Sequence, residues 1–140
     1  MKTLTALFAL AALIVGGAAM AGESPAPKNA YLYIGWPNNG EVIQKNNFRV
    51  WFGLRKMGVA PAGVAKPKTG HHHLIVDASL PPMDEEIPSD KNHLHFGKGQ
   101  TETRITLPSG THTLQLLLGD LEHVPHNPPV VSQKITVTVK

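Results

Sequence analysis

The chain has 140 residues, with 13 basic and 10 acidic side chains, a formal net charge of +3 and no cysteine. This length suits one domain. The lack of cysteine excludes disulfides, cysteine nucleophiles and lipid attachment at a cysteine. The lysines are scattered and are not interleaved with aromatic residues, whereas nucleic-acid binding needs a dense basic face. We therefore expect no nucleic-acid partner.

Residues 1–21 are typical of a secretory signal peptide. Lys2 supplies the positive start, residues 4–15 are almost entirely apolar, and Ala19-Met20-Ala21 fits the small-x-small cleavage pattern. The apolar run is short and is followed by glycines, which disfavours a stable membrane span, although an uncleaved anchor is the alternative. We expect cleavage after residue 21, a periplasmic or secreted protein, and no stable membrane span after cleavage.

The rest of the chain divides into a flexible leader, residues 22–29, and a single β-sandwich domain, residues 30–140. Short segments rich in aromatic and β-branched residues are separated by turns rich in Gly, Pro and Asn. The expected strands are, in chain order, Ala30–Trp36, Glu41–Ile43, Phe48–Leu54, a strand beginning at His71, His93–Phe96, Gln100–Leu107, Thr111–Leu118 and Val130–Lys140. Residues 57–70 and 79–92 are expected to be loops.

The strand pattern predicts the fold class. The last strand shows the clearest alternation, because Ile135, Val137 and Val139 are separated by two threonines. No segment after the signal peptide has a sustained helical apolar stripe. Seven or eight short strands predict an all-β, antiparallel, immunoglobulin-like β-sandwich, with a small closed barrel as the alternative.

All eight histidines lie between residues 71 and 126. Side chains alternate across a strand, so His71 and His73 share one face and His72 takes the other. His93 and His95 form a second His-x-His pair. His112 shares its face with core-like leucines and is expected near a rim of the sandwich. His123 and His126 follow in a loop that can close over that rim.

Imidazole is the commonest side-chain ligand for borderline metals. The clustering therefore predicts a transition-metal site, with copper or zinc as the ion. The predicted ligands are His71, His73, His93, His95, His112 and His123. Asp77, Asp120 and Glu102 are candidate carboxylate ligands or acceptors for an imidazole N–H.

The sequence leaves one main alternative to a metal site and gives little support to others. The histidines can instead be structural, in a non-enzymatic binding or adaptor module whose protein partner the sequence does not identify. No serine stands in a Gly-x-Ser-x-Gly turn, so a serine hydrolase is not indicated. The acidic residues 84–86 lack the alternating spacing of a calcium loop. Because no general acid can be assigned, we expect no enzymatic activity, and a metalloenzyme ranks third.

Four segments resemble the bacterial DUF4399 family: residues 70–77, 93–102, 110–120 and 123–132. The resemblance extends over roughly residues 31–140. Family members look like small exported proteins without an assigned activity, so the resemblance implies export and a single domain. A fainter similarity, in the two His-x-His pairs, is to copper/zinc superoxide dismutases, whose disulfide cysteines and long ligand-bearing loop this chain lacks.

Overall fold

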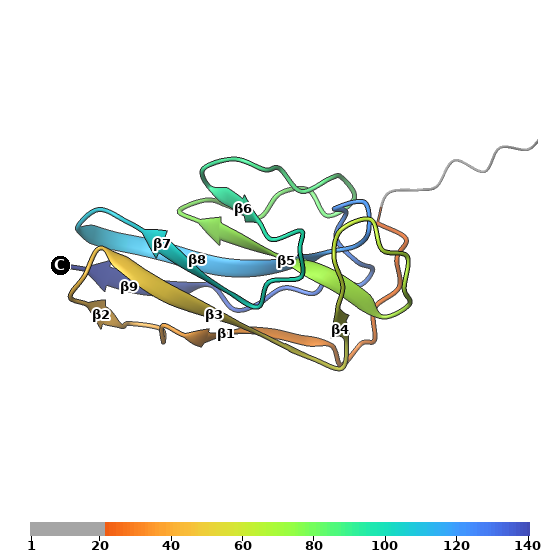
Figure 1. Cartoon of the computed structure of the whole chain (residues 1–140), viewed down its shortest axis with the longest axis horizontal. Helices are drawn as coiled ribbons and strands as arrows, with labels where there is room; N and C mark the ends of the chain where they lie inside the picture. Colours follow the sequence, from red (N-terminus) through yellow and green to blue (C-terminus); the bar gives the residue numbers. More distant parts are fainter. Residues whose placement is uncertain (1–21) are drawn as a thin grey trace, which may run out of the picture.

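The computed structural model describes residues 22–140, and the predicted signal peptide lies outside them. The described residues form nine strands and no helix, which confirms the all-β prediction (Figure 1). The strands are β1 Tyr31–Trp36, β2 Val42–Ile43, β3 Asn47–Arg55, β4 Gly58–Val59, β5 Thr69–Val76, β6 His93–His95, β7 Glu102–Thr106, β8 Gly110–Gly119 and β9 Ile135–Val139.

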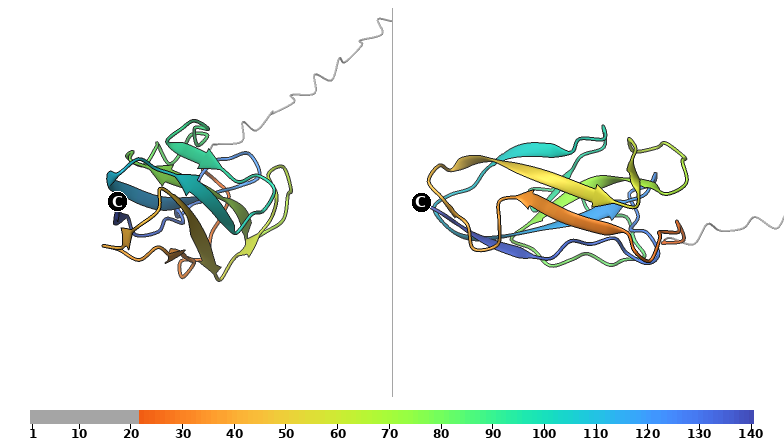
Figure 2. Two further views of the ribbon diagram at one scale, coloured as in Figure 1. Left: turned by 60° about the vertical axis from the view of Figure 1, so that its left-hand side comes forward. Right: turned by 90° about the horizontal axis from the view of Figure 1, so that it is seen from below.

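The strands make two sheets that face each other. A three-stranded sheet has the order β1-β3-β7, and a six-stranded sheet has the order β2-β9-β8-β5-β4, with β6 also pairing with β5. Neighbours are antiparallel except for β2 with β9 and β4 with β5. In the right-hand view of Figure 2, β1 and β3 of the smaller sheet lie in front of the larger sheet.

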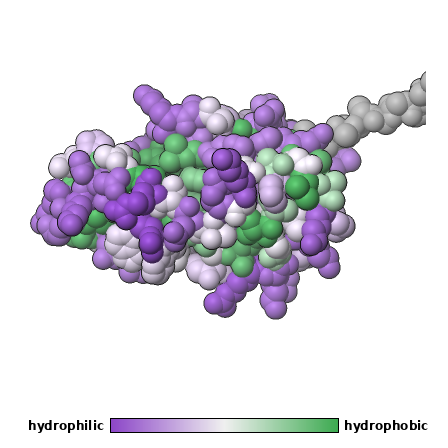
Figure 3. Space-filling model, viewed as in Figure 1, coloured by the Kyte–Doolittle hydropathy of each residue, from purple (hydrophilic) through white to green (hydrophobic). Residues whose placement is uncertain are grey.

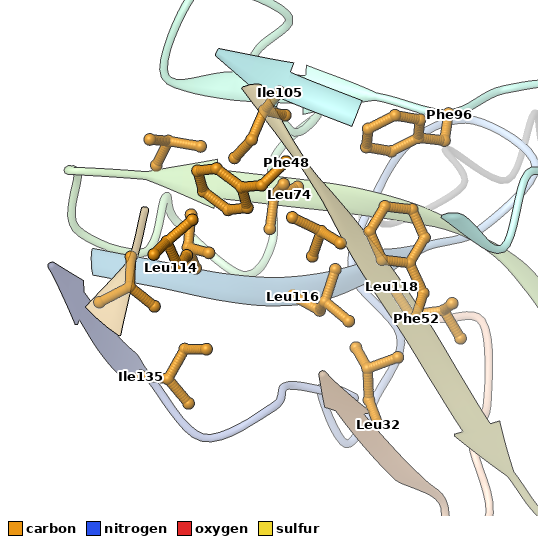
Figure 4. Packing of buried hydrophobic residues seen from close by; sticks show 14 of the residues in the cluster. Leu32, Phe48, Phe52, Leu74, Phe96, Ile105, Leu114, Leu116, Leu118 and Ile135 are labelled. Carbon is orange, nitrogen blue, oxygen red and sulfur yellow. The ribbon is translucent and has the colours of Figure 1, made fainter. Parts of the chain in front are cut away.

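The main core fills the space between the sheets (Figure 4). Phe48, Val50 and Phe52 point inward from β3, as their alternation with polar residues predicts. β8 contributes Leu114, Leu116 and Leu118, all fully buried. Each such side chain adds about 1.5–3 kcal/mol when removed from water. This core fixes the two sheets and therefore the direction in which each β5 side chain points.

The larger sheet is also covered on its outer face, near the middle of β5 and β8. Ile75 and Leu117 form a second, smaller cluster there with Ile87, which comes from the loop after β5. This explains why the second half of β8 contains three consecutive leucines, Leu116 to Leu118, because a strand segment buried on both faces has no solvent side. The outer face of β5 is thus a partly enclosed environment.

Two elements differ from the sequence expectation. The short strand β4 lies within a segment predicted to be loop, because Gly58 and Val59 pair in parallel with the start of β5. β9 begins at Ile135 rather than Val130. Residues 130–132 still run beside β8, but they make single hydrogen bonds instead of a continuous ladder.

The surface has no large continuous apolar area on the face drawn in Figure 3, where hydrophobic residues form separate patches among polar ones. Exposed large hydrophobic residues include Tyr31, Val42 and Trp51. Among residues 22–140, no helix is long and apolar enough to cross a membrane.

Candidate metal centre

The site begins with the three consecutive histidines of β5, which the strand divides between its two faces. His72 points into the core, where its ring lies 5.1 Å from that of Phe52 and its Nδ1 lies 3.2 Å from the carbonyl oxygen of Gln100. His71 and His73 point to the outer face, and their rings are 4.8 Å apart. The triple histidine therefore does not act as one unit, as strand alternation predicts.

Two further imidazoles join this pair from other segments. His95 of β6 lies directly opposite His73 in the antiparallel register, with ring centroids 5.1 Å apart. His123 comes from the loop after β8, and its ring lies 4.7 Å from that of His95 and 5.0 Å from that of His71. We call His71, His73, His95 and His123 the histidine cluster.

The cluster leaves ring nitrogens without partners. Both nitrogens of His71, both nitrogens of His73, and Nε2 of His95 are buried and make no hydrogen bond to any group of residues 22–140. His71 and His73 are completely buried. More than nine in ten buried polar groups in proteins have a partner, and an unpaired one costs about 1–3 kcal/mol. Five such atoms in one place make the cluster a candidate site for a bound group.

The environment keeps the buried imidazoles neutral. Burial lowers the pKa of His71 from 6.5 to about 4, with neighbouring His123 and His95 adding to the effect. Burial lowers the pKa of His73 to about 2, and the other three histidines of the cluster act in the same direction. The pKa of His95 is lowered by burial and then by His123. A neutral imidazole has a free lone pair, which is the form that binds a metal.

Two glycines make room for the rings, and the sequence reading did not identify them. A Cβ at Gly97 would lie 2.4 Å from Cε1 and 2.6 Å from Nε2 of His95. A Cβ at Gly119 would lie 2.7 Å from Cε1 of His73. Neither glycine has a positive φ, so the requirement is for space and not for an unusual backbone. Gly97 follows β6 in a Gly-Lys-Gly turn, a pattern that resembles an ordinary hairpin turn and so hid this role.

The geometry suits an ion held by three or four imidazoles. One nitrogen each of His71, His95 and His123 can be chosen so that all lie within 4.8 Å of one another. Zinc–nitrogen bonds of about 2.0–2.1 Å place tetrahedral ligand nitrogens roughly 3.4 Å apart. Binding then needs these nitrogens to approach one another by up to about 1.4 Å. His73 borders this trio, and its ring lies 4.8 Å from that of His71 and 5.1 Å from that of His95, but 6.2 Å from that of His123.

Two of the predicted ligands lie outside the cluster. His93 points away, and its Nδ1 lies 2.9 Å from the carboxylate of Asp90; this hydrogen bond lowers the pKa of Asp90. His112 lies beside the end of β5, where Asp77 Oδ2 is 2.6 Å from its Nδ1. Since His71 lies near the start of β5 and Asp77 directly follows the strand, about 20 Å of extended chain separates them. His112 and His123 therefore occupy different ends of the sheet, and not one rim as the sequence suggested.

The candidate carboxylates lie elsewhere or are already hydrogen-bonded. Asp120 accepts hydrogen bonds from Ser24 Oγ and from the amides of Glu122 and Val124, and its charge partly offsets the lowering of the His71 pKa. Glu102 is on the surface, 3.9 Å from Arg49. The cluster itself therefore offers imidazole nitrogens, with the exposed carboxylate of Glu86 4.0 Å from His123 Nδ1.

The comparisons with known proteins identify the family. Residues 50–140 match the family described as "Domain of unknown function (DUF4399)". The chain belongs to the DUF4399 family. This confirms the resemblance seen in the sequence, and the matched region contains all eight histidines of this DUF4399 protein. No curated protein and no solved structure matches the chain.

Proposed function

We propose that this protein binds one transition-metal ion, copper or zinc, through the histidine cluster. His71, His95 and His123 are the core ligands, and His73 is the fourth. The protein acts outside the cytoplasm, in the periplasm or after secretion, as an immunoglobulin-like sandwich that carries, buffers or senses the metal. The signal-peptide pattern of residues 1–21, a prediction from the sequence, supports this location.

One observation carries the proposal: five buried ring nitrogens without a hydrogen-bond partner meet where three histidine ligand atoms approach within 4.8 Å. Histidines that only join segments have partners, as His112 does with Asp77 and Pro108. His71 and His73 have none within the described residues, although their burial costs desolvation, and His123 has only the exposed carboxylate of Glu86, 4.0 Å from its Nδ1. Coordination of a metal would satisfy one nitrogen on each ring at once.

The donor set decides which metals fit. Imidazole suits copper, zinc, nickel and iron, whereas calcium and magnesium require oxygen ligands, which the cluster lacks. By the Irving–Williams order, a site of nitrogen ligands binds Cu²⁺ more tightly than Zn²⁺. An ion can reach the cluster past His123, whose side chain is 31% exposed while His71 and His73 are closed off.

Titration of the metal-free mature protein tests the proposal. We expect one equivalent of Cu²⁺ or Zn²⁺ to bind more tightly than about 1 μM by calorimetry, and elemental analysis of protein purified without an affinity tag to find the same metal. Weaker binding of both ions would reject the proposal. If replacing His73 and His95 by Ala then lowered stability in metal-free buffer without changing metal content, the histidines would be structural, and the chain would be a non-enzymatic binding module.

A further inference from the structure

The loop that carries His123 is closed by one buried carboxylate. Asp120 directly follows β8, and its Oδ1 accepts the amide hydrogens of Glu122 and Val124, each at 2.9 Å. Its backbone completes the turn: Asp120 N donates to Val124 O at 2.8 Å, and Asp120 O accepts from His123 N at 3.1 Å. Aspartate is favoured in such turns because its side chain accepts from the amide two residues on. Four hydrogen bonds to one residue therefore set the path of the loop.

The backbone of His123 is held in an uncommon conformation. Its φ is 67°, in the left-handed region that residues other than glycine rarely adopt. Its N–H donates to Asp120, and its carbonyl oxygen accepts from the amide of the buried Ile87 at 2.8 Å. Strained backbone persists only where its surroundings impose it, and such residues gather at ligand sites. The hydrogen bonds around the loop therefore decide where the His123 ring lies.

The N-terminal segment braces the same carboxylate from outside the loop. Ser24 Oγ donates to Asp120 Oδ2 at 2.6 Å, a charge-assisted hydrogen bond between residues 96 positions apart. Ser24 is held in turn, because its carbonyl oxygen accepts from Asn127 N at 2.9 Å, and Ala26 N donates to Asn127 O at 3.1 Å. In Figure 1 this segment, drawn in orange-red, lies beside the blue loop after β8. Residues 24–26 thus tie the start of the described chain to the loop of His123.

Asp120 supports the histidine cluster without being one of its ligands. Its two oxygens already accept three hydrogen bonds, and the trio of approaching ligand atoms comes from histidines alone. Groups that orient a metal ligand from behind still matter, because their loss typically weakens metal binding about 10–100-fold. The carboxylate also carries a charge, so a test must separate its hydrogen bonds from that charge.

We propose that Asp120, braced by Ser24, is the positioning residue of the metal centre. Together they hold the loop in the conformation that presents His123 to the rest of the histidine cluster. This inference rests on the proposed metal binding, and it makes the N-terminal segment a determinant of whether the ligand set is complete. Without the carboxylate, two loop amides lose their acceptor and His123 is free to leave its left-handed conformation. The site then keeps the imidazoles of the sheet and loses the one that the loop supplies.

Two substitutions at Asp120 separate the hydrogen bonds from the charge. Asparagine keeps an oxygen for the two loop amides and an NH₂ group that donates to Ser24 Oγ, whereas alanine keeps neither. Competition with a chromophoric chelator should show Zn²⁺ binding weakened about 10–100-fold in Asp120→Ala and mostly restored in Asp120→Asn. Ser24→Ala should fall between wild type and Asp120→Ala, because it removes only the brace.

The matched control is Asp90→Ala. Asp90 Oδ1 also accepts two backbone amide hydrogens, from Asn92 and His93, but beside a histidine outside the cluster. Removing it should leave the Zn²⁺ affinity nearly unchanged. A general effect of deleting a turn carboxylate would instead lower the affinity in both variants.

Nuclear magnetic resonance of the metal-free mature protein reads the position of the loop without any metal. The ring C–H protons of His123 should show Overhauser contacts with those of His71 and His95, whose ring centroids lie 5.0 and 4.7 Å away. Asp120→Ala should lose these contacts, whereas Asp120→Asn and Asp90→Ala should keep them. If Asp120→Ala does not fold, Ser24→Ala, on a partly exposed residue, gives the same two readouts.

Three results would overturn the inference. The first is ring contacts and affinity that stay at the wild-type level in Ser24→Ala and in Asp120→Ala. The second is an equal loss of affinity in Asp120→Asn and Asp120→Ala, which would assign the effect to charge. The third is an equal loss in Asp120→Ala and Asp90→Ala. A wild type that binds no metal would reject the metal proposal instead, while the contacts in the metal-free protein still judge the brace.

Discussion

At the start of β5, His71 and His73 face other imidazoles, whereas beyond its end His112 faces the carboxylate of Asp77. His71 and His73 have no partner for either nitrogen within the described residues, and burial lowers their pKa. His112 has an acceptor at each nitrogen, Asp77 and the carbonyl of Pro108, and the hydrogen bond to Asp77 raises its pKa. One residue type thus has opposite charge preferences at the two ends, because the surrounding groups differ.

The difference separates a binding site from a structural contact. A protonated His112 donates both of its N–H groups to acceptors of the protein, so its bonding capacity is complete. A neutral His71 still has a lone pair to share. We therefore expect changes in pH and in metal concentration to affect the histidine cluster and the His112–Asp77 pair differently.

Acidification should destabilise the metal-free protein through the start of β5. The unfolded chain takes up protons near pH 6.5, but folded His71 does so only near pH 4. Between these values the unfolded state binds more protons, so stability falls as pH falls. Lowering the pH from 6.5 to 5 should cost about 2 kcal/mol from His71 alone, with His72 and His73 adding to this loss.

Urea unfolding at several pH values measures this loss. His112 does not obscure it, since the stabilisation from a raised pKa is already complete below pH 6.5. A saturating zinc concentration should reduce the loss, because a bound ion stabilises the folded form. Constant stability between pH 6.5 and 5 would contradict the neutral state assigned to the buried imidazoles.

Replacing His95 by Ala should weaken metal binding at least about 100-fold, since loss of a ligand exceeds the 10–100-fold cost of losing a group that only orients one. His93→Ala is the matched control: it is in the same strand, two residues away, and its ring pairs with Asp90. Competition with a chromophoric chelator measures both affinities. Equal losses in the two variants would remove the distinction between histidines inside and outside the cluster.

Gly97→Ala tests the space beside the His95 ring. The added methyl group overlaps the ring, with 2.4 Å to Cε1, and should displace it and weaken metal binding about tenfold. Gly58→Ala, whose Cβ would meet nothing closer than 3.4 Å, is the control. Both variants keep an allowed backbone, so melting temperatures should change little. Unchanged affinity in Gly97→Ala would show that the ring position is not needed.

Asp77→Asn should have the smallest effect, and only at low pH. It removes a charge-assisted hydrogen bond from His112 on a partly exposed carboxylate, worth about 1 kcal/mol after solvent screening. Because the pKa of His112 is raised, this contribution is complete below pH 6.5 and is lost as the pH rises through the folded pKa. Urea unfolding should therefore distinguish the variant from wild type at pH 5.5 and not at pH 9. A difference that persisted at pH 9 would show that the pair does not depend on protonation.

Particular residues show how far the sequence could predict the site. Strand alternation indicated that His71 and His73 share a face, because that depends on the backbone alone. Alternation also placed His93 and His95 on one face. Only His95 reaches the cluster, since His93 lies opposite Ile75, two residues further along β5.

The sequence by itself determined most of the strands, the faces of β5 and the family, because period-two patterns and local motifs need no knowledge of distant contacts. Only the tertiary structure decided which histidines meet. His73 and His95 are brought together by the pairing of β5 with β6, and His123 by the loop after β8. Such contacts between distant segments depend on register and on space, here the missing Cβ atoms of Gly97 and Gly119. A shift of one residue in the pairing register of a strand would turn every side chain of that strand to the other face of the sheet.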